Sequence, residues 1–307
     1  MGKPGSEGGY SDATLGLAAI ALAAALWAVA AAVARALFDD GVEPLELVQA
    51  RSLLSAAGLA LIPAAWRRPA VPRIGRVIAL GLCIALVNAS YYIAIQRLAV
   101  AVAIVLQYLA PALVVIWTAA VTRRRPSTEV IVAVVVAFLG VVLVAEITGG
   151  ELARLDAPGL LAGLAAAVLF ASYTLLSEKA GEAYGILGAL FRGFVAASVA
   201  WIVFQSFRGW PSALFTPDHL PLVLFVGLGG TLAPFILYLW GVQRVRAERA
   251  TIASTLEPVL VALFAWIWLG QALSPIQLGG GALIIGAILS LQLGRQARHV
   301  PGPDAPT

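Results

Sequence analysis

Long apolar segments recur along the whole chain, and they constrain its fold more than any other feature. Each is roughly 20 residues long, the length at which a helix crosses about 30 Å of hydrocarbon. Hydrophobic residues make up 61% of the chain and charged residues only 12%, so a soluble protein of this composition would lack polar surface. The sequence therefore predicts a polytopic membrane protein. We count ten candidate spans, approximately at residues 14–38, 44–65, 74–96, 98–121, 128–146, 157–178, 184–207, 219–243, 249–269 and 275–294.

The distribution of basic residues predicts the orientation of these spans, because cytoplasmic loops are enriched in Lys and Arg. With the N-terminus inside, the outer loops hold only Arg97, Arg154 and Arg208, and most of the 20 Lys and Arg residues lie on inner loops and tails. We therefore expect a multi-pass protein of the cytoplasmic (inner) membrane with both termini in the cytoplasm. This topology also accounts for the net charge of +4, so no nucleic-acid partner is predicted.

The two ends of the chain are polar. Residues 1–13 predict a short cytoplasmic N-terminal segment, and the first apolar segment is too long for the core of a cleaved signal peptide. Residues 295–307 hold three prolines and several basic residues, and they predict a disordered cytoplasmic tail.

The fourth predicted span and the residues before it occur twice in the chain, at an offset of 147 residues. The alignment places Gln96–Arg97 on Gln243–Arg244 and Pro111 on Pro258 without a gap. Proline inside an apolar helix removes a backbone hydrogen bond and kinks the helix. We therefore expect a kink at the same place in each copy.

The duplication extends to two five-span repeats, residues 14–146 and 157–294. Trp27 in the first span corresponds to Phe170 in the sixth, and Arg51 corresponds to Arg192. An odd number of spans in each repeat forces the second repeat to enter the membrane from the opposite side. The predicted fold is an all-α polytopic membrane protein with ten transmembrane helices, arranged as two inverted five-helix repeats around a central cavity.

Polar and aromatic side chains inside the spans indicate which helix faces line a path through the membrane, because such groups are costly in hydrocarbon. They occur at helical spacing in several spans, whereas the fifth and tenth lack them and are predicted to be peripheral scaffold helices. The inferred cavity is aromatic and weakly polar, which suits amphiphilic organic molecules better than ions or sugars. The predicted substrate-binding residues are Trp27, Asn88, Tyr91, Tyr92, Gln107, Tyr108, Pro111, Phe170, Tyr173, Thr174, Ser177, Phe235, Tyr238, Ser254, Glu257 and Pro258.

Three ionisable residues inside the spans leave alternatives open. Glu257 lies about 12 Å into its span, where it serves either a functional or a structural role. As a functional group it would couple protons or bind a substrate ammonium group; as a structural one it would accept hydrogen bonds or pair with an arginine. Arg51 and Arg192 are either ligands of a substrate carboxylate or, as we favour, structural residues that form ion pairs or reach the interface.

The tenth span carries a stripe of small residues, Ala282, Gly286, Ser290 and Gly294, at four-residue spacing. Such a stripe lets another helix approach closely. We favour packing within a monomer, with dimerisation through this helix as the alternative.

Other classes of function lack the residues they need. The chain has neither a His-Glu-x-x-His nor a Gly-x-Ser-x-Gly motif, all its Asp residues lie outside the spans, and Cys83 is its one cysteine. Serine-triad and zinc chemistry are therefore excluded, and we predict no enzyme activity, metal or cofactor. The sequence shows no filter-like motif of a channel and no phosphate-binding loop of an ATPase.

Together these features resemble the EamA-type drug/metabolite transporter superfamily. The resemblance is carried by the two inverted repeats, the paired prolines, Leu26-Trp27 in the first span and the stretch Leu256-Glu257-Pro258-Val259. It covers residues 14–295 and implies a monomeric basket in which spans one to four and six to nine surround a cavity. The chain most resembles the bacterial exporters of aromatic and other hydrophobic amino acids, the YddG type. The four-span multidrug relatives depend on a glutamate in their first span, and the first span here holds no acid.

The sequence thus predicts a secondary transporter that exports aromatic or hydrophobic amino acids and similar small metabolites across the cytoplasmic membrane by alternating access. The alternative is a transporter of the same fold for a nucleotide-derived or quaternary-amine compound. An anionic substrate would require arginines that face the cavity.

Overall fold

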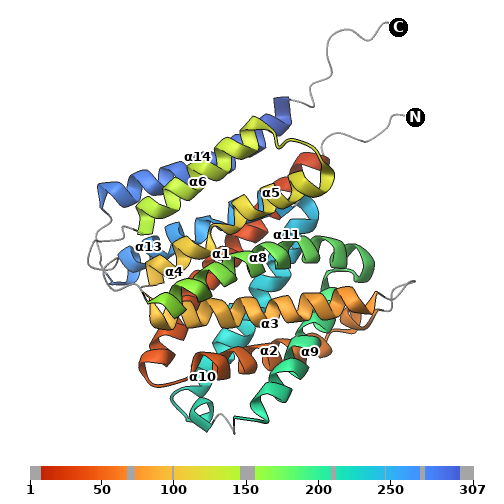
Figure 1. The fold of residues 1–307 in the computed structure, drawn as a ribbon, viewed down its shortest axis with the longest axis vertical. Coiled ribbons are helices and arrows are strands. Elements are labelled where there is room, and N and C mark those ends of the chain that lie inside the picture. The colour runs from red at the N-terminus through yellow and green to blue at the C-terminus, as the bar shows by residue number, and fades with distance from the viewer. Residues whose placement is uncertain are drawn as a thin grey trace, which may run out of the picture.

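The computed structural model describes residues 8–67, 73–98, 100–145, 156–208, 212–245, 247–269 and 274–297. These residues form helices that lie side by side, and no strand occurs among them (Figure 1). Helix α1 begins and helix α14 ends on the same side of the bundle (Figure 1). This placement is the one expected for a chain that crosses the membrane an even number of times.

Most of the predicted spans form one uninterrupted helix each. In the first repeat these are α1 (Gly8–Asp39), α2 (Pro44–Ala60), α3 (Ile74–Arg97) and α6 (Thr128–Ala145). In the second repeat they are α8 (Ala157–Tyr184), α9 (Ile186–Gln205) and α14 (Pro275–Ala297). Two short 3₁₀ helices, η1 (Pro63–Trp66) and η2 (Ser212–Phe215), lie in the connections.

The fourth and ninth predicted spans are each broken into two helices, which confirms the predicted kinks. Pro111 lies in the first turn after one break and Pro258 in the first turn after the other, where a missing N–H leaves no hydrogen bond unmade. The helices before the breaks, α4 and α12, have corresponding bounds at the offset of 147 residues. The pairs are α4 (Val100–Gln107) with α5 (Ala110–Thr122), and α12 (Ala247–Ser254) with α13 (Leu256–Leu269).

The eighth predicted span is less regular than the sequence indicated. It consists of α10 (Leu220–Leu224), a π-helical stretch η3 (Phe225–Leu232) and α11 (Ala233–Val245). The π-helical stretch contains Gly227, Gly229 and Gly230. Without side chains these glycines let neighbouring helices approach, because an added Cβ at Gly227 would meet Leu54 and one at Gly230 would meet Ala30. π-helical turns are rare and occur frequently at functional sites.

The number of membrane crossings is supported in part. Seven helical stretches in the described part of the chain are long and apolar enough to cross a membrane. They are Asp12–Asp39, Ile74–Arg97, Val102–Thr122, Thr128–Ala145, Ala157–Tyr184, Ile186–Gln205 and Leu220–Val245. Helix α2 has 17 residues, and α14 includes a shorter apolar stretch, Pro275–Ser290. The structure thus shows a multi-pass helical membrane protein, and the total of ten spans stays a prediction.

The helices pack into two bundles that each combine both repeats. In the first bundle α3, α4 and α5 contact α8; in the second bundle η3, α11, α12 and α13 contact α1. Each of these contacts has its counterpart when the repeats are exchanged. Helices α2 and α9 contact each other and also pack against both bundles.

An ion pair fastens equivalent helix ends in the two bundles. In the first bundle Arg97 at the end of α3 is 3.3 Å from Asp156 at the start of α8. In the second bundle Arg244 in α11 is 3.7 Å from Asp12 in α1. Arg97 and Arg244 are equivalent residues of the two repeats, so the pairs support the view that each bundle is one body.

Helices α6 and α14 form a pair along one edge of the molecule (Figure 1). Gly140 and Gly280 meet where the two helices cross, and a Cβ at either would lie 2.7 Å from the carbonyl oxygen of the other.

The predicted small-residue stripe on α14 does not make this contact with α6. Ala282 and Gly286 are exposed, and an added Cβ at Gly286 would meet open space. Our interpretation of the stripe as packing within the monomer is therefore wrong for these two residues, because α14 turns its other face toward α6. Ser290 is exposed as well, and the surroundings of Gly294, the last residue of the stripe, lie outside what the structure describes.

Candidate functional site

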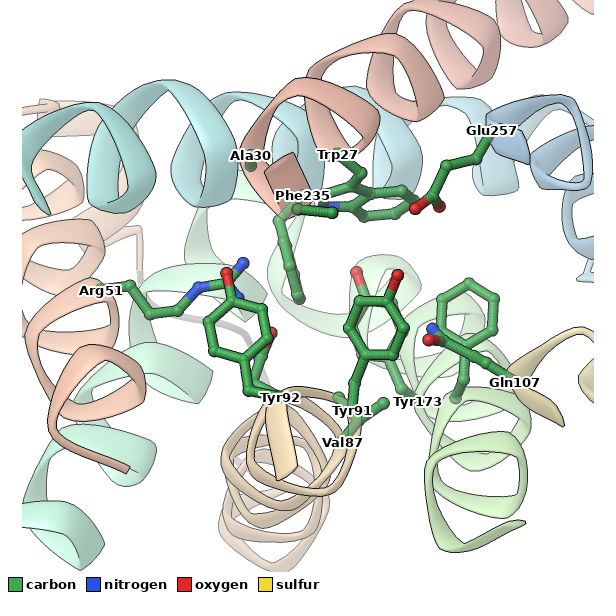
Figure 2. A pocket seen from close by; sticks show the side chains of 13 residues that line it. Trp27, Ala30, Arg51, Val87, Tyr91, Tyr92, Gln107, Tyr173, Phe235 and Glu257 are labelled. Carbon is green, nitrogen blue, oxygen red and sulfur yellow. The ribbon is translucent and has the colours of Figure 1, made fainter. Parts of the chain in front are cut away.

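A cavity lies between the first and second bundles, and its empty space of about 530 Å³ includes the part that is open to solvent. Both bundles and α2 contribute to its wall (Figure 2), and no lining residue comes from the described side chains of α6 and α14. The predicted site residues that line it are Trp27, Asn88, Tyr91, Tyr92, Gln107, Phe170, Tyr173, Phe235 and Glu257.

Trp27 of α1 anchors the aromatic part of the wall. The centroid of its indole ring is 5.7 Å from that of Phe235, 6.2 Å from that of Phe170 and 5.4 Å from that of Tyr238. Aromatic pairs at these separations contribute about 0.5–1.5 kcal/mol each beyond their buried area. Ala30 and Ala31 line the cavity one turn further along α1, and their small side chains leave space beside the rings. The result is a rigid apolar surface with open volume next to it.

Arg51 of α2 lies at one side of the cavity and is held by the π-helical stretch of the eighth span. Its Nε donates to the hydroxyl of Thr231 at 2.6 Å, and its Nη2 donates to the carbonyl of Gly230 at 3.3 Å. Its guanidinium lies 4.7 Å from the centroid of the Tyr92 ring (Figure 2), a cation–π distance. Arg51 is 97% buried, since its exposed fraction is 3%. The positive charge is thus fixed in the wall of the cavity.

Glu257 lies at the break between α12 and α13 and also faces the cavity. Its carboxylate accepts a hydrogen bond of 2.8 Å from the hydroxyl of Tyr108, which lies at the break between α4 and α5. The Tyr108 hydroxyl is also 2.6 Å from the carbonyl oxygen of Ser254. The two helix breaks therefore meet, and the contact holds a carboxylate at the centre of the molecule. Among the described residues, no arginine forms an ion pair with Glu257.

Several predicted site residues lie behind the cavity wall and contact each other. The hydroxyl groups of Thr174 and Tyr238 are 3.0 Å apart, and both residues are fully buried. Tyr108 reaches Glu257 but is not part of the lining, and Ser254 supplies a carbonyl to it. The residues of the predicted set that do not line the cavity are Tyr108, Pro111, Thr174, Ser177, Tyr238, Ser254 and Pro258.

The sequence prediction missed four lining residues, Ala30, Ala31, Arg51 and Val87. The alanines and Val87 carry no polar group and cannot be told from packing residues by sequence. Arg51 was considered as a ligand of a substrate carboxylate, because an arginine inside a span is rare, but a structural role was favoured and the structure places it in the cavity wall. Its counterpart Arg192 has a structural role, but through hydrogen bonds to backbone carbonyl groups and not through the ion pair or interface contact that we favoured. Arg192 donates to the carbonyl groups of Ala65, Gly188 and Arg67, away from the cavity.

Comparison with known proteins relates this architecture to transporters. The EamA-like transporter family matches residues 14–145 and 157–292. The chain is 28% identical over 214 residues to the threonine/homoserine exporter RhtA of Escherichia coli strain K12, covering 70% of this chain and 68% of RhtA. It is 26% identical over 300 residues to the uncharacterized transporter YwfM of Bacillus subtilis strain 168, covering 92% and 97%. A solved crystal structure at 22% identity matches with a TM-score of 0.68 over 94% of this chain and 99% of that chain, so it shares the fold.

Proposed function

The chain belongs to the EamA-like transporter family, and we propose that it is a secondary transporter that exports amino acids across the cytoplasmic membrane by alternating access. Membership makes it a multi-pass membrane transporter of small molecules. The proposal adds the substrate class, the direction and the mechanism. A relative at 28% identity bears the name of a threonine/homoserine exporter, which supports both amino acids as the class and export as the direction.

The observation that carries the proposal is the pair of opposite charges in the cavity. Arg51 and Glu257 both line it, and Figure 2 shows them on opposite sides with Trp27 and Phe235 between them. A free amino acid carries a carboxylate and an ammonium group and therefore complements such a site. The carboxylate would contact Arg51 and the ammonium group would contact Glu257. The aromatic wall would take the side chain, which favours hydrophobic and aromatic amino acids.

The two bundles provide the moving parts that alternating access requires. Each is fastened internally by an ion pair and by close helix packing, and the cavity lies between them. Rocking one bundle against the other would open the cavity to each side in turn, as in other transporters built from inverted repeats. The two helix breaks meet at Tyr108 and Glu257. Movement of one bundle against the other would therefore change the contacts of a substrate bound there.

The test is uptake into liposomes that contain the purified protein, with a panel of labelled amino acids and unlabelled competitors. We expect saturable uptake of Phe, Trp or Met, and the panel includes threonine and homoserine because of the name of the relative. Liposomes without protein provide the control. Folded protein that takes up no amino acid would contradict the proposal.

A quaternary-amine compound is the competing substrate, because Glu257 and the aromatic rings could hold a cation without help from Arg51. The same liposomes distinguish the two substrate classes. If a quaternary amine is the substrate, unlabelled quaternary amine should inhibit uptake of the labelled compound, and unlabelled amino acids should not. A nucleotide-derived anion is less well matched by the site, because Arg51 is the one basic residue among the lining residues that the structure describes.

Trp27 provides a test of specificity. Trp27→Ala removes the indole ring that contacts Phe170 and Phe235, so we expect the KM for aromatic substrates to rise roughly tenfold. The KM for threonine should change less. Fluorescence-detected size-exclusion chromatography would show whether the variant is folded, and an equal loss for all substrates would contradict a role in specificity.

A further inference from the structure

The two sides of the interface between the bundles differ, although the repeats correspond. Helices α8 and α11 meet on one side of the cavity, and their counterparts α1 and α3 meet on the other. The α8–α11 contact is the more extensive of the two. The equivalent residues on the two sides show what causes this difference.

Gln243 closes the interface on the α8–α11 side. Its Nε2 donates to the carbonyl oxygen of Glu178 at 3.0 Å and lies 3.4 Å from that of Ser177. The amide group lies directly over Gly181, where an added Cβ would overlap it. A glutamine can therefore reach these carbonyl groups of α8 only because position 181 has no side chain.

A second contact lies between Gln243 and the cavity. The hydroxyl groups of Tyr238 and Thr174 are 3.0 Å apart, and both residues are fully buried. The counterparts of these residues in the other repeat are Tyr91 and Ala31, and both of those line the cavity. On the α1–α3 side the cavity therefore occupies the space that packed side chains fill on the α8–α11 side.

The α1–α3 side lacks the equivalent of the Gln243 contact. Gln96, the counterpart of Gln243, has an exposed side chain. Phe38 occupies the position that corresponds to Gly181, and its ring takes the space that the glutamine amide fills over Gly181 in the other repeat. On this side the partly exposed Arg35 side chain donates a hydrogen bond of 3.0 Å to the carbonyl of Ile95, and the Phe38 ring packs on Tyr92 with their centroids 5.4 Å apart.

We propose that Gln243 and Gly181 form a latch that closes one side of the cavity and that has to open once in every transport cycle. The inference rests on the proposed function in one respect, namely that transport proceeds by alternating access. The distribution of Lys and Arg places the latch on the cytoplasmic side. With the latch formed, we expect substrate to reach the cavity only from the other side of the membrane.

The experiment measures access of a water-soluble maleimide to the interface beneath the latch. Cys83→Ser removes the native thiol, so that Ser177→Cys provides the single reporter thiol. Position 177 is chosen because Ser177 is fully buried. The latch is broken in two independent ways, by Gln243→Ala and by Gly181→Ala. Gln96→Ala is the matched control from the other repeat. Labelling is followed in inside-out and right-side-out vesicles of the full-length protein.

We expect both latch variants to raise the labelling rate on the order of tenfold, because one or two amide hydrogen bonds bias a two-state equilibrium by about that factor. The increase should appear from the cytoplasmic side, and Gln96→Ala should leave the rate unchanged. Gly181→Ala also distinguishes a latch from a merely structural contact, because alanine has a higher helix propensity than glycine and by itself stabilises α8. It should therefore open the interface without lowering the melting temperature.

Unchanged labelling in both latch variants, or an equal increase in Gln96→Ala, would overturn the proposal. If Ser177→Cys does not fold, Thr174→Cys reports on the same buried face of α8. The assay does not depend on substrate identity. A panel of amino acids that fails to be transported would thus contradict the proposed function, whereas the labelling result alone decides the latch.

Discussion

Arg51 and Arg192 occupy equivalent positions in the two repeats but have different partners. Arg51 lines the cavity and binds Thr231 and Gly230, whereas Arg192 holds the backbone of the α2–α3 connection at Ala65. The same residue type thus lines the cavity in one repeat and holds backbone carbonyl groups away from the cavity in the other. The difference follows from the helix that each arginine faces.

Arg51→Lys tests this assignment. Lysine keeps the charge but cannot reproduce the forked guanidinium contacts, so we expect the KM for a transported amino acid to rise roughly 10–100-fold. The matched variant Arg192→Lys should leave the KM within about threefold of the wild-type value and instead lower the melting temperature. Uptake kinetics and thermal melts of both variants provide the check. Equal KM changes in the two variants would contradict the role of Arg51.

Glu257→Gln tests the carboxylate at the other side of the cavity. Glutamine has nearly the same shape and still accepts the hydrogen bond from Tyr108, so the fold should be retained. Loss of the negative charge should raise the KM for amino acids roughly tenfold. Inhibition by a carboxylic acid that lacks the ammonium group should not change, because that compound makes no contact with the charge.

The same variant tests proton coupling. If Glu257 carries the coupled proton, Glu257→Gln should abolish uptake driven by a pH gradient and still permit exchange of substrate at saturating concentrations. Exchange and gradient-driven uptake are measured in the same liposomes. A pH dependence equal to that of the wild type would exclude Glu257 as the coupling group.

At the scale of elements, the broken helices differ in role from the pair formed by α6 and α14, called the edge pair below. The breaks at α4–α5 and α12–α13 interrupt regular backbone at the centre of the bundle, and they bring Tyr108 to Glu257. Irregular backbone at membrane depth is tolerated where it is buried in protein or lines a cavity. Helices α6 and α14 are unbroken and lie away from the cavity, so we expect mutations there to change stability and not substrate affinity.

Gly140→Ala tests the edge pair. The added Cβ would lie 2.7 Å from the carbonyl oxygen of Gly280 and 2.7 Å from Cγ1 of Ile284, so the helices must separate. We expect a loss of about 1–3 kcal/mol in stability with an unchanged KM. Gly279→Ala is the control, because its Cβ would meet no atom within 4 Å. Equal thermal melts for the two variants would contradict tight packing at this crossing.

At the scale of the whole molecule, the asymmetry of loop charges predicts the orientation in the membrane. A reporter fused to either terminus should be accessible only from the cytoplasm, because basic loops are retained on that side. Protease protection of tagged protein in right-side-out and inside-out vesicles measures this. A terminus that is cleaved in right-side-out vesicles would contradict the predicted topology and would also reverse the side of the latch.

Much of the fold could be predicted from sequence because its signals are local. Apolar segments of membrane-spanning length, the internal duplication and the paired prolines each depend on residues close together in the chain, and the helix breaks occur where the prolines predict them. The seven long spans and the two-repeat match agree with that outline. The π-helical stretch of the eighth span was missed, since a glycine-rich run does not by itself specify that geometry.

The lining of the cavity was decided only by the tertiary structure. Helical spacing can select a polar face, but it cannot tell whether that face meets a cavity or another helix. Tyr91 and Tyr238 are equivalent in sequence, yet Tyr91 lines the cavity and Tyr238 packs against Thr174. The sequence alone determined the membrane-spanning helices and their repetition, because chain length and hydrophobicity suffice for both. The placement of the bundles determined which copy of each repeated residue faces the cavity, because the interface is packed more extensively on the α8–α11 side than on the α1–α3 side.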